Sequence, residues 1–103
     1  MDPSRLSEVM NTSTARCWSS DSYNPCPGVM ENVPSSREYA GGFGSALMLK
    51  DLGLAVDAAN GAKVALPLGS NAQTLYDTIC KMGYANKDFG SVFEVLSQNK
   101  LDK

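Results

Sequence analysis

The stretch FGSALMLKDLGLA, residues 43–55, decides the fold that this sequence predicts. Its apolar residues recur at helical spacing on more than one face, which predicts a helix over residues 44–60 that is apolar almost all the way round. A helix of this kind belongs at the centre of its domain, and Asn60-Gly61 is a suitable C-terminal stop. Two full charges, Lys50 and Asp51, interrupt the apolar run and need an explanation.

The two charges lie side by side in the sequence but not on one face of the helix. Consecutive helical residues point about 100° apart, so we expect that Lys50 and Asp51 do not neutralise each other and that each needs its own partner. One interpretation is structural: Lys50 extends its stem to solvent, and Asp51 forms an ion pair elsewhere. The other is functional: this part of the helix lines a cleft and presents a cation to an anionic ligand, and Gly41-Gly42-Phe43 permits close approach of the backbone.

Three other segments carry helical apolar spacing and recognisable ends. Asp2 is suited to cap the first of them and Asp88 to cap the last, because a short carboxylate accepts hydrogen bonds from free backbone N–H groups. Pro67 opens the middle one and Gly83 closes it. The predicted helices are residues 3–11, 67–82 and 88–98.

Residues 12–42 differ from the rest of the chain, since they are rich in Ser, Asn, Pro and Gly and have no sustained period. Trp18, Tyr23 and Tyr39 argue against disorder, because disordered segments are poor in aromatic residues. We expect an ordered loop with a short helical turn near residues 17–21. No stretch alternates as a strand does, so the predicted fold class is all-α: one domain, residues 1–103, of about four helices plus a long ordered loop.

The composition excludes several classes of function. The 103 residues suit one small domain, and a formal net charge of −2 argues against nucleic-acid binding, which needs a basic face. The chain has no histidine, which removes the commonest metal ligand and general base, and we expect no metal site. Three cysteines without a paired spacing predict reduced thiols. No apolar run approaches the roughly 20 residues of a membrane span.

The residues also carry a family resemblance. RCWSSDSYNPCPGVMENVPSSREYAGGFGSALMLKDLGLA, residues 16–55, is similar to the 3-hydroxyisobutyrate dehydrogenases of the β-hydroxyacid dehydrogenase family. The pattern F-x-x-x-L-x-x-K-D-L-x-L-A belongs to the wider family, whereas RCWSS, YNP and GGF together are narrower. The similarity continues through LPLGSNAQTLYDTICKMGY and DFGSVFEVL, so it covers essentially the whole chain.

The resemblance implies a two-domain enzyme with an architecture like that of 6-phosphogluconate dehydrogenase. The chain then corresponds to the all-α C-terminal domain, without the connecting helix and the N-terminal dinucleotide-binding domain, which would hold most of the NAD. The G-x-G-x-x-G fingerprint is absent here. By resemblance, Lys50 is a cofactor-binding residue, Phe43 and Asp51 line the substrate end of the cleft, and no residue of this chain is catalytic, since the family's catalytic lysine lies upstream.

The function implied is that of a C-terminal substrate/cofactor-cleft and oligomerisation domain. The whole enzyme would oxidise 3-hydroxyisobutyrate to methylmalonate semialdehyde with NAD in valine degradation, in the mitochondrial matrix, as a homodimer or homotetramer. This piece alone would be inactive. The alternative is a stand-alone helical dimerisation or interaction module derived from the same fold. The preference for NAD or NADP stays open.

Overall fold

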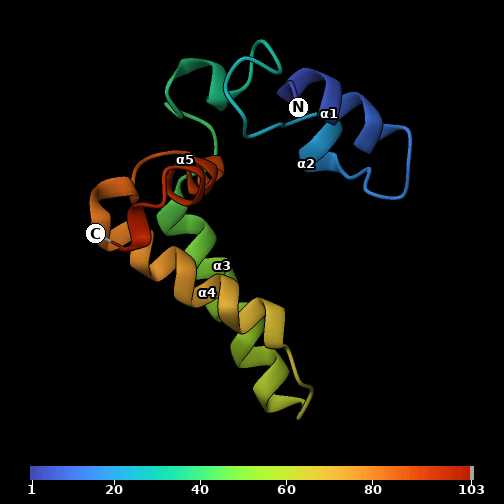
Figure 1. Ribbon diagram of the computed structural model, residues 1–103. Coiled ribbons are helices and arrows are strands. Elements are labelled where there is room, and N and C mark those ends of the chain that lie inside the picture. The colour runs from blue at the N-terminus through green and yellow to red at the C-terminus, as the bar shows by residue number, and fades with distance from the viewer. Residues whose placement is uncertain (103) are drawn as a thin grey trace.

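A computed structural model describes residues 1–102 (Figure 1), and within these residues the chain forms helices and no strand. Its α-helices are α1 (Pro3–Asn11), α2 (Trp18–Asp21), α3 (Ser45–Gly61), α4 (Pro67–Ile79) and α5 (Val92–Ser97). Shorter helical turns are η1 (Pro34–Arg37), η2 (Cys80–Tyr84), η3 (Phe89–Ser91) and η4 (Lys100–Asp102). Gly44 and Asp88 form an isolated antiparallel bridge. No helix in the described part is long and apolar enough to cross a membrane.

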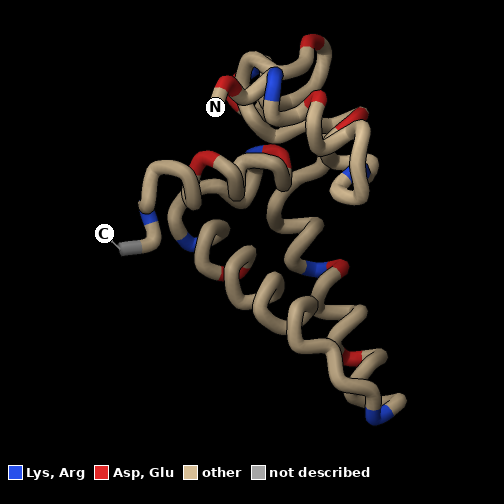
Figure 2. The backbone as a smooth tube through the Cα atoms, turned by 45° about the vertical axis from the view of Figure 1, so that its right-hand side comes forward, with Lys and Arg blue, Asp and Glu red and all other residues tan. Residues whose placement is uncertain are grey.

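The helices form an arm and a second group that lies beyond one end of it. Helices α3 and α4 lie side by side and make the arm, whereas α1 and α2 lie together near the N-terminus (Figure 1). Helix α5 packs where α3 begins and α4 ends. The molecule measures 42 × 32 × 26 Å along its principal axes. Charged positions are sparse along the arm (Figure 2), as the apolar pattern of residues 43–55 predicts.

The helix ends follow the local signals in the sequence. Helix α1 begins at Pro3, and the Asp2 carboxylate accepts a hydrogen bond from the Arg5 backbone N–H at 3.1 Å. Helix α3 ends at Gly61, so this predicted stop is confirmed. Helix α4 ends at Ile79, earlier than predicted, because residues Cys80–Tyr84 continue as the wider π-helical turn η2. Gly83 has a φ of 101° in that turn, a conformation suited to glycine.

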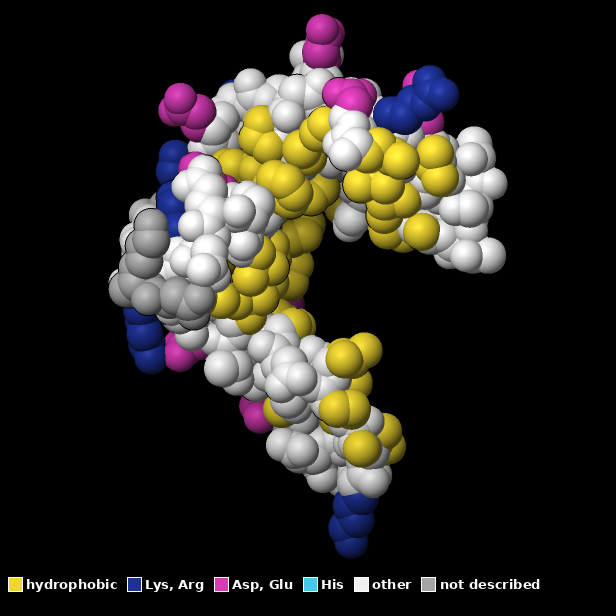
Figure 3. All heavy atoms as spheres, in the orientation of Figure 1, with side chains coloured by type: hydrophobic (Ala, Val, Ile, Leu, Met, Phe, Trp, Pro, Cys, Tyr) yellow, Lys and Arg dark blue, Asp and Glu magenta, His cyan; other side chains and the backbone are white. Residues whose placement is uncertain are grey.

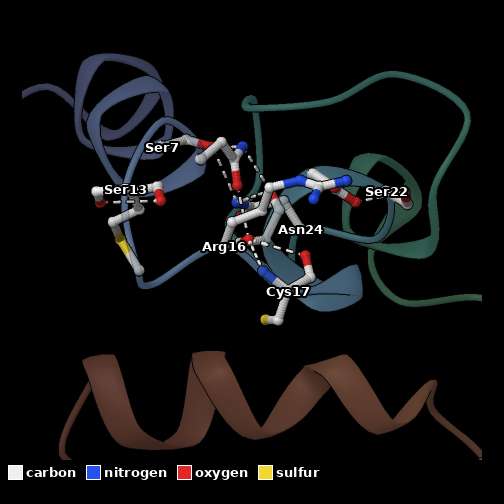
Figure 4. A network of polar contacts seen from close by, with 10 residues as sticks. Ser7, Ser13, Arg16, Cys17, Ser22 and Asn24 are labelled. Carbon is white, nitrogen blue, oxygen red and sulfur yellow. Dashed lines mark hydrogen bonds and ion pairs between the residues drawn. The ribbon is translucent and has the colours of Figure 1, made fainter.

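Residues 12–42 are held by polar side chains as well as by aromatic ones. Helix α2 confirms the predicted turn near residues 17–21. The buried Ser20 hydroxyl donates to Oδ1 of Asn11 at 2.6 Å, and the Asn11 amide donates back to the Ser20 carbonyl at 3.2 Å. The Asn24 amide nitrogen donates to the Ser7 hydroxyl oxygen at 3.4 Å (Figure 4). This network joins α1, α2 and the loop that follows.

The apolar core is small and lies at the junction of α3, α4 and α5. Tyr76, Ile79 and Val95 are its buried residues, and Ile79 and Val95 are 0% exposed. Partly buried side chains from all three helices pack around them: Met48, Leu49, Leu52, Leu75, Tyr84, Phe89 and Val92. The centre of the fold is thus where α3 begins rather than along its whole length.

The expectation that the helix of residues 44–60 is buried on all sides is wrong. Leu47 is 49% exposed and Leu54 is 61% exposed, and on α4 Leu68 is 81% exposed. The reason is that α4 is the main helix packed along α3 and covers only one face of it. Figure 3 shows apolar side chains gathered on the inner side of the bend between the arm and the second group. Apolar composition therefore predicts the helix but not which faces are covered.

Candidate functional site

The start of α3 is docked on the segment that leads into α5. The Ser45 backbone N–H donates to the Lys87 carbonyl at 2.8 Å, and the Ala46 N–H donates to the Ala85 carbonyl at 3.0 Å. The Phe89 N–H donates to the Phe43 carbonyl at 2.7 Å. These bonds replace intrahelical partners that the first turn of a helix lacks, so the position of Phe43 is fixed relative to η3.

Asp88 lies at the centre of this junction and is 1% exposed. Its Oδ2 accepts from the Gly90 N–H at 2.8 Å, which confirms the predicted cap. Its Oδ1 accepts from the Tyr23 hydroxyl at 2.6 Å and from the Phe43 N–H at 2.9 Å. One carboxylate thus joins three segments that are far apart in the sequence.

Four aromatic rings contact one another through the junction, in the spatial order Trp18, Tyr23, Phe89 and Phe43. Trp18 stacks on Tyr23 with ring centroids 4.6 Å apart and an interplanar angle of 19°. Tyr23 stacks on Phe89 at 5.5 Å and 13°, and Phe43 meets Phe89 edge-on at 6.1 Å and 81°. We call these four residues the aromatic stack. Trp18 is 58% exposed, so one end of the stack presents a flat apolar ring to solvent.

The interior of the stack is apolar enough to change the ionisation of a phenol. Burial raises the pKa of Tyr23 to about 12. The hydrogen bond to Asp88 and the negative charge of the Asp88 carboxylate raise it as well. A cavity of about 190 Å³ adjoins the stack. The residues that line the cavity are Ser19, Tyr23, Pro25, Tyr76, Phe89, Gly90 and Val92.

The structure places the three predicted site residues in two different surroundings. Phe43 is partly buried in the aromatic stack, whereas Lys50 and Asp51 lie on the exposed part of α3 about two turns further along. The Lys50 ammonium and an Asp51 carboxylate oxygen are 3.0 Å apart, with 61% and 51% of the side chains exposed. The expectation that these charges do not pair is therefore wrong, because both side chains bend along the helix surface.

Sequence reasoning missed the residues that hold the aromatic stack together. It used Trp18 and Tyr23 only as evidence that residues 12–42 are ordered, and it gave Asp88 a capping role alone. The signal that was available is the pair Gly41-Gly42 directly before Phe43, since paired glycines indicate close backbone contact. Nothing in the sequence pattern connects that pair to Asp88, which lies 45 residues from Phe43.

The chemistry offered by these residues is binding rather than proton transfer. Lys50 is an exposed cation, Trp18 is an exposed flat ring, and the Tyr23 phenol stays protonated at neutral pH. The three cysteines are free thiols. In residues 1–102 no group of three or more His, Cys, Asp or Glu side chains is placed to hold a metal ion. Lys50 is suited to an anionic group and Trp18 to a planar ring, and the two side chains lie in different surroundings.

The chain matches a known family over most of its length. Residues 1–96 match the family described as NAD-binding of NADP-dependent 3-hydroxyisobutyrate dehydrogenase. NAD is therefore the cofactor associated with this part of the family, and its binding is assigned to the matched residues themselves.

This match corrects the predicted fold assignment and the predicted role. We expected an all-α C-terminal domain, a substrate/cofactor-cleft and oligomerisation domain with NAD held mainly by a separate, absent domain. The family description instead makes residues 1–96 the NAD-binding part. The prediction gave this chain one cofactor-binding residue, Lys50, and assigned the rest of the NAD site elsewhere because the G-x-G-x-x-G fingerprint is absent here. That fingerprint serves the pyrophosphate at one kind of helix N-terminus, and a helical surface can contact the nucleotide without it.

Individual relatives agree with the family match. The mitochondrial 3-hydroxyisobutyrate dehydrogenase of Rattus norvegicus is 53% identical over 100 residues, which are 97% of this chain and 30% of that protein. A probable mitochondrial 3-hydroxyisobutyrate dehydrogenase of Dictyostelium discoideum is 54% identical over 96% of the chain and 31% of its own length.

A solved structure has the same fold. The structure titled Mycobacterium tuberculosis 3-hydroxyisobutyrate dehydrogenase with L-serine superimposes with a TM-score of 0.86 at 35% identity, over 92% of this chain and 32% of that one. The chain thus spans about 30% of the length of the curated relatives that it matches. Taken with the 96 matched residues and the helical architecture, these comparisons show that the chain belongs to the 3-hydroxyisobutyrate dehydrogenase family.

Proposed function

We propose that this chain contributes a nucleotide-contacting surface to an NAD-dependent 3-hydroxyisobutyrate dehydrogenase. The observation that carries the proposal is the family match, which describes residues 1–96 as NAD-binding. The relatives from Rattus norvegicus and Dictyostelium discoideum are mitochondrial enzymes, and by this resemblance the chain is mitochondrial as well. The reaction proposed for the whole protein is oxidation of 3-hydroxyisobutyrate to methylmalonate semialdehyde in valine degradation.

The residues of the chain fit such a cofactor. A nicotinamide nucleotide carries anionic phosphates and planar rings. The exposed Lys50 ammonium is suited to the anionic part, and the aromatic stack to a planar or apolar part. The ion pair with Asp51 holds Lys50 against α3, so the ammonium is in place before the ligand arrives.

The substrate proposed is a small 3-hydroxy carboxylate. The mycobacterial structure is titled with L-serine, which shares a hydroxyl on carbon 3 and a carboxylate with 3-hydroxyisobutyrate. When bound, NAD would supply the acceptor for the hydride from the carbon that bears the hydroxyl, and the hydroxyl proton would pass to the catalytic lysine that the resemblance places upstream of this chain. We propose that Phe43 excludes water at the substrate end, and that Asp51 orients polar groups there through its position beside Lys50.

Replacement of Lys50 tests the proposal. In the whole protein that contains this chain, we expect Lys50→Ala to raise the Kd for NAD by about tenfold, which corresponds to roughly 1.4 kcal/mol, while the fold is retained. The matched control is Lys81→Ala, because Lys81 forms a similar exposed pair with Asp77 at 2.8 Å on another helical segment. Quenching of protein fluorescence gives the Kd, and reduction of NAD with 3-hydroxyisobutyrate gives the activity.

Two results would contradict the proposal. Equal Kd values for the wild type and Lys50→Ala would make Lys50 an ordinary surface charge. An equal rise in Kd for Lys81→Ala would show that the effect is one of net charge rather than of a site. A wild-type protein that neither binds NAD nor oxidises 3-hydroxyisobutyrate would overturn the assignment as a whole.

A further inference from the structure

Asp88 makes more contacts than its place at the start of η3 requires. A helix cap needs one hydrogen bond, and Oδ2 provides it by accepting from the Gly90 N–H. The two bonds to Oδ1 come from Tyr23 and Phe43, 65 and 45 residues away in the sequence. The Asp88 carboxylate is 1% exposed and accepts from three donors, and these hydrogen bonds offset the cost of burying its charge.

The backbone four and five residues before Phe43 has an unusual conformation and is held by residues 87 and 88. Glu38 and Tyr39 have φ values of 56° and 60°, in the left-handed region that side chains other than glycine rarely adopt. The Asp88 N–H donates to the Tyr39 carbonyl at 2.8 Å, and the Lys87 ammonium donates to the Glu38 carbonyl at 3.0 Å. Strain of this kind persists where the surroundings fix the backbone, and it concentrates at functional sites.

Gly42 shows how closely this region is packed. Its φ is +67°, and a Cβ at this position would clash with the Asp88 carboxylate, the Pro34 ring and the Tyr23 hydroxyl. The glycine is therefore required by the same contacts that Asp88 makes. The segments that contain Tyr23, Pro34 and Gly42-Phe43 converge on one carboxylate, and two of these three carry rings of the aromatic stack.

We propose that Asp88 is a positioning residue of the site: through Oδ1 it fixes the Tyr23 ring and the Phe43 backbone relative to each other, and so sets the substrate end of the cleft. Tyr23 and Phe43 both contact Phe89, so a shift of either one opens the stack. A displacement of about 1 Å at a reacting centre can cost on the order of 100-fold in rate. This inference rests on the proposed function.

The test compares Asp88→Ser with Asp88→Asn in the whole protein. Serine can still cap η3 but is too short to reach Tyr23 and Phe43, whereas asparagine can keep its one oxygen in reach of both and loses only the bond from the Gly90 N–H. We expect Asp88→Ser to raise the KM for 3-hydroxyisobutyrate roughly 10- to 100-fold, with the Kd for NAD unchanged, and Asp88→Asn to recover most of the loss. Asp77→Asn, on the exposed face of α4, is the control.

A spectroscopic signal reports the geometry directly. The chain has one tryptophan, Trp18, and it stacks on Tyr23. Asp88→Ser should therefore shift the Trp18 emission, whereas Asp88→Asn should shift it little; in the whole protein, Trp18→Phe identifies the contribution of this residue by difference. Tyr23→Phe removes only the hydroxyl that donates to Asp88, and it should raise the KM in the same direction even if Asp88→Ser does not fold.

Each outcome separates this inference from the proposed function. An unchanged KM in folded Asp88→Ser, or an unchanged KM in Tyr23→Phe, would overturn the positioning role. So would a loss in Asp88→Ser that affects KM, kcat and the Kd for NAD alike and follows the loss of helical structure, since that describes a purely structural residue. A wild-type protein without NAD binding or turnover would instead overturn the proposed function, and the wild type is measured in the same series.

Discussion

Three tyrosine hydroxyls donate hydrogen bonds inside the protein, and their ionisation is costly as a result. Tyr23 donates to Asp88, Tyr39 donates to the Pro25 carbonyl at 2.7 Å, and Tyr76 donates to the Phe89 carbonyl at 2.8 Å. Burial raises the pKa of each phenol to about 12. In all three cases the folded state favours the protonated form.

This pKa shift predicts a loss of stability at alkaline pH. A phenol whose pKa is raised on folding binds its proton more tightly in the native state than in the unfolded state. The stability that such a phenol contributes to the folded state is fully present below a pH of about 10, the ordinary pKa of tyrosine. It is lost as the pH rises to about 12. Urea unfolding across this range, followed by circular dichroism, should show the decline. A flat profile would contradict the prediction, and Tyr76→Phe should make the decline shallower.

At the level of single residues, the sequence predicted what depends on near neighbours. The Asp88 cap was predictable because its Gly90 partner is two residues away. The bonds from Tyr23 and Phe43 to Asp88 were not, because loop closure brings together segments whose spacing carries no periodic signal. The pairing of Lys50 with Asp51 was also missed, since flexible side chains can meet where their Cβ directions diverge.

At the scale of the helix, truncating a buried side chain of α4 should destabilise the protein much more than truncating an exposed one. Ile79 is 0% exposed in the core, whereas Leu68 on the same helix is 81% exposed. We expect Ile79→Ala to lower the free energy of unfolding by about 2–5 kcal/mol, because it removes buried methyl groups and leaves a cavity. Leu68→Ala should change it by less than about 0.5 kcal/mol. Equal effects in urea unfolding would contradict the packing described for α4.

The helices themselves could be predicted, and their burial could not. Caps and stops at Asp2, Gly61 and Asp88 act within a turn, so they fix where helices begin and end. Burial depends on which other helix packs on a face. Leu54 satisfies the helical apolar pattern as well as Leu52 does, yet Leu52 packs on the core and Leu54 is 61% exposed. The pattern identifies faces that could be covered, and tertiary packing decides which ones are.

At the scale of the whole molecule, large apolar side chains remain on the surface. Those that are about half or more exposed include Val9, Trp18, Leu47, Leu54, Val64 and Leu68. A cavity of about 390 Å³, lined largely by apolar residues such as Leu6, Met10, Val29 and Phe93, opens beside α1. Exposed apolar surface of this extent favours association with other protein surfaces.

We therefore propose that the isolated chain is a dimer or otherwise self-associates; for the whole enzyme the resemblance implied a homodimer or homotetramer. Burial of Leu54 and Leu68 between copies would remove apolar surface from water, and this contribution scales with the area covered. Light scattering after size-exclusion chromatography should give a mass above that of one chain, which falls on dilution. The double variant Leu54→Ser/Leu68→Ser should shift the mass toward the monomer, whereas Lys81→Ser, an exposed polar change, should not. A monomeric wild-type chain at all concentrations would contradict the proposal, and it would mean that these apolar faces are covered by other parts of the longer protein rather than by a second copy.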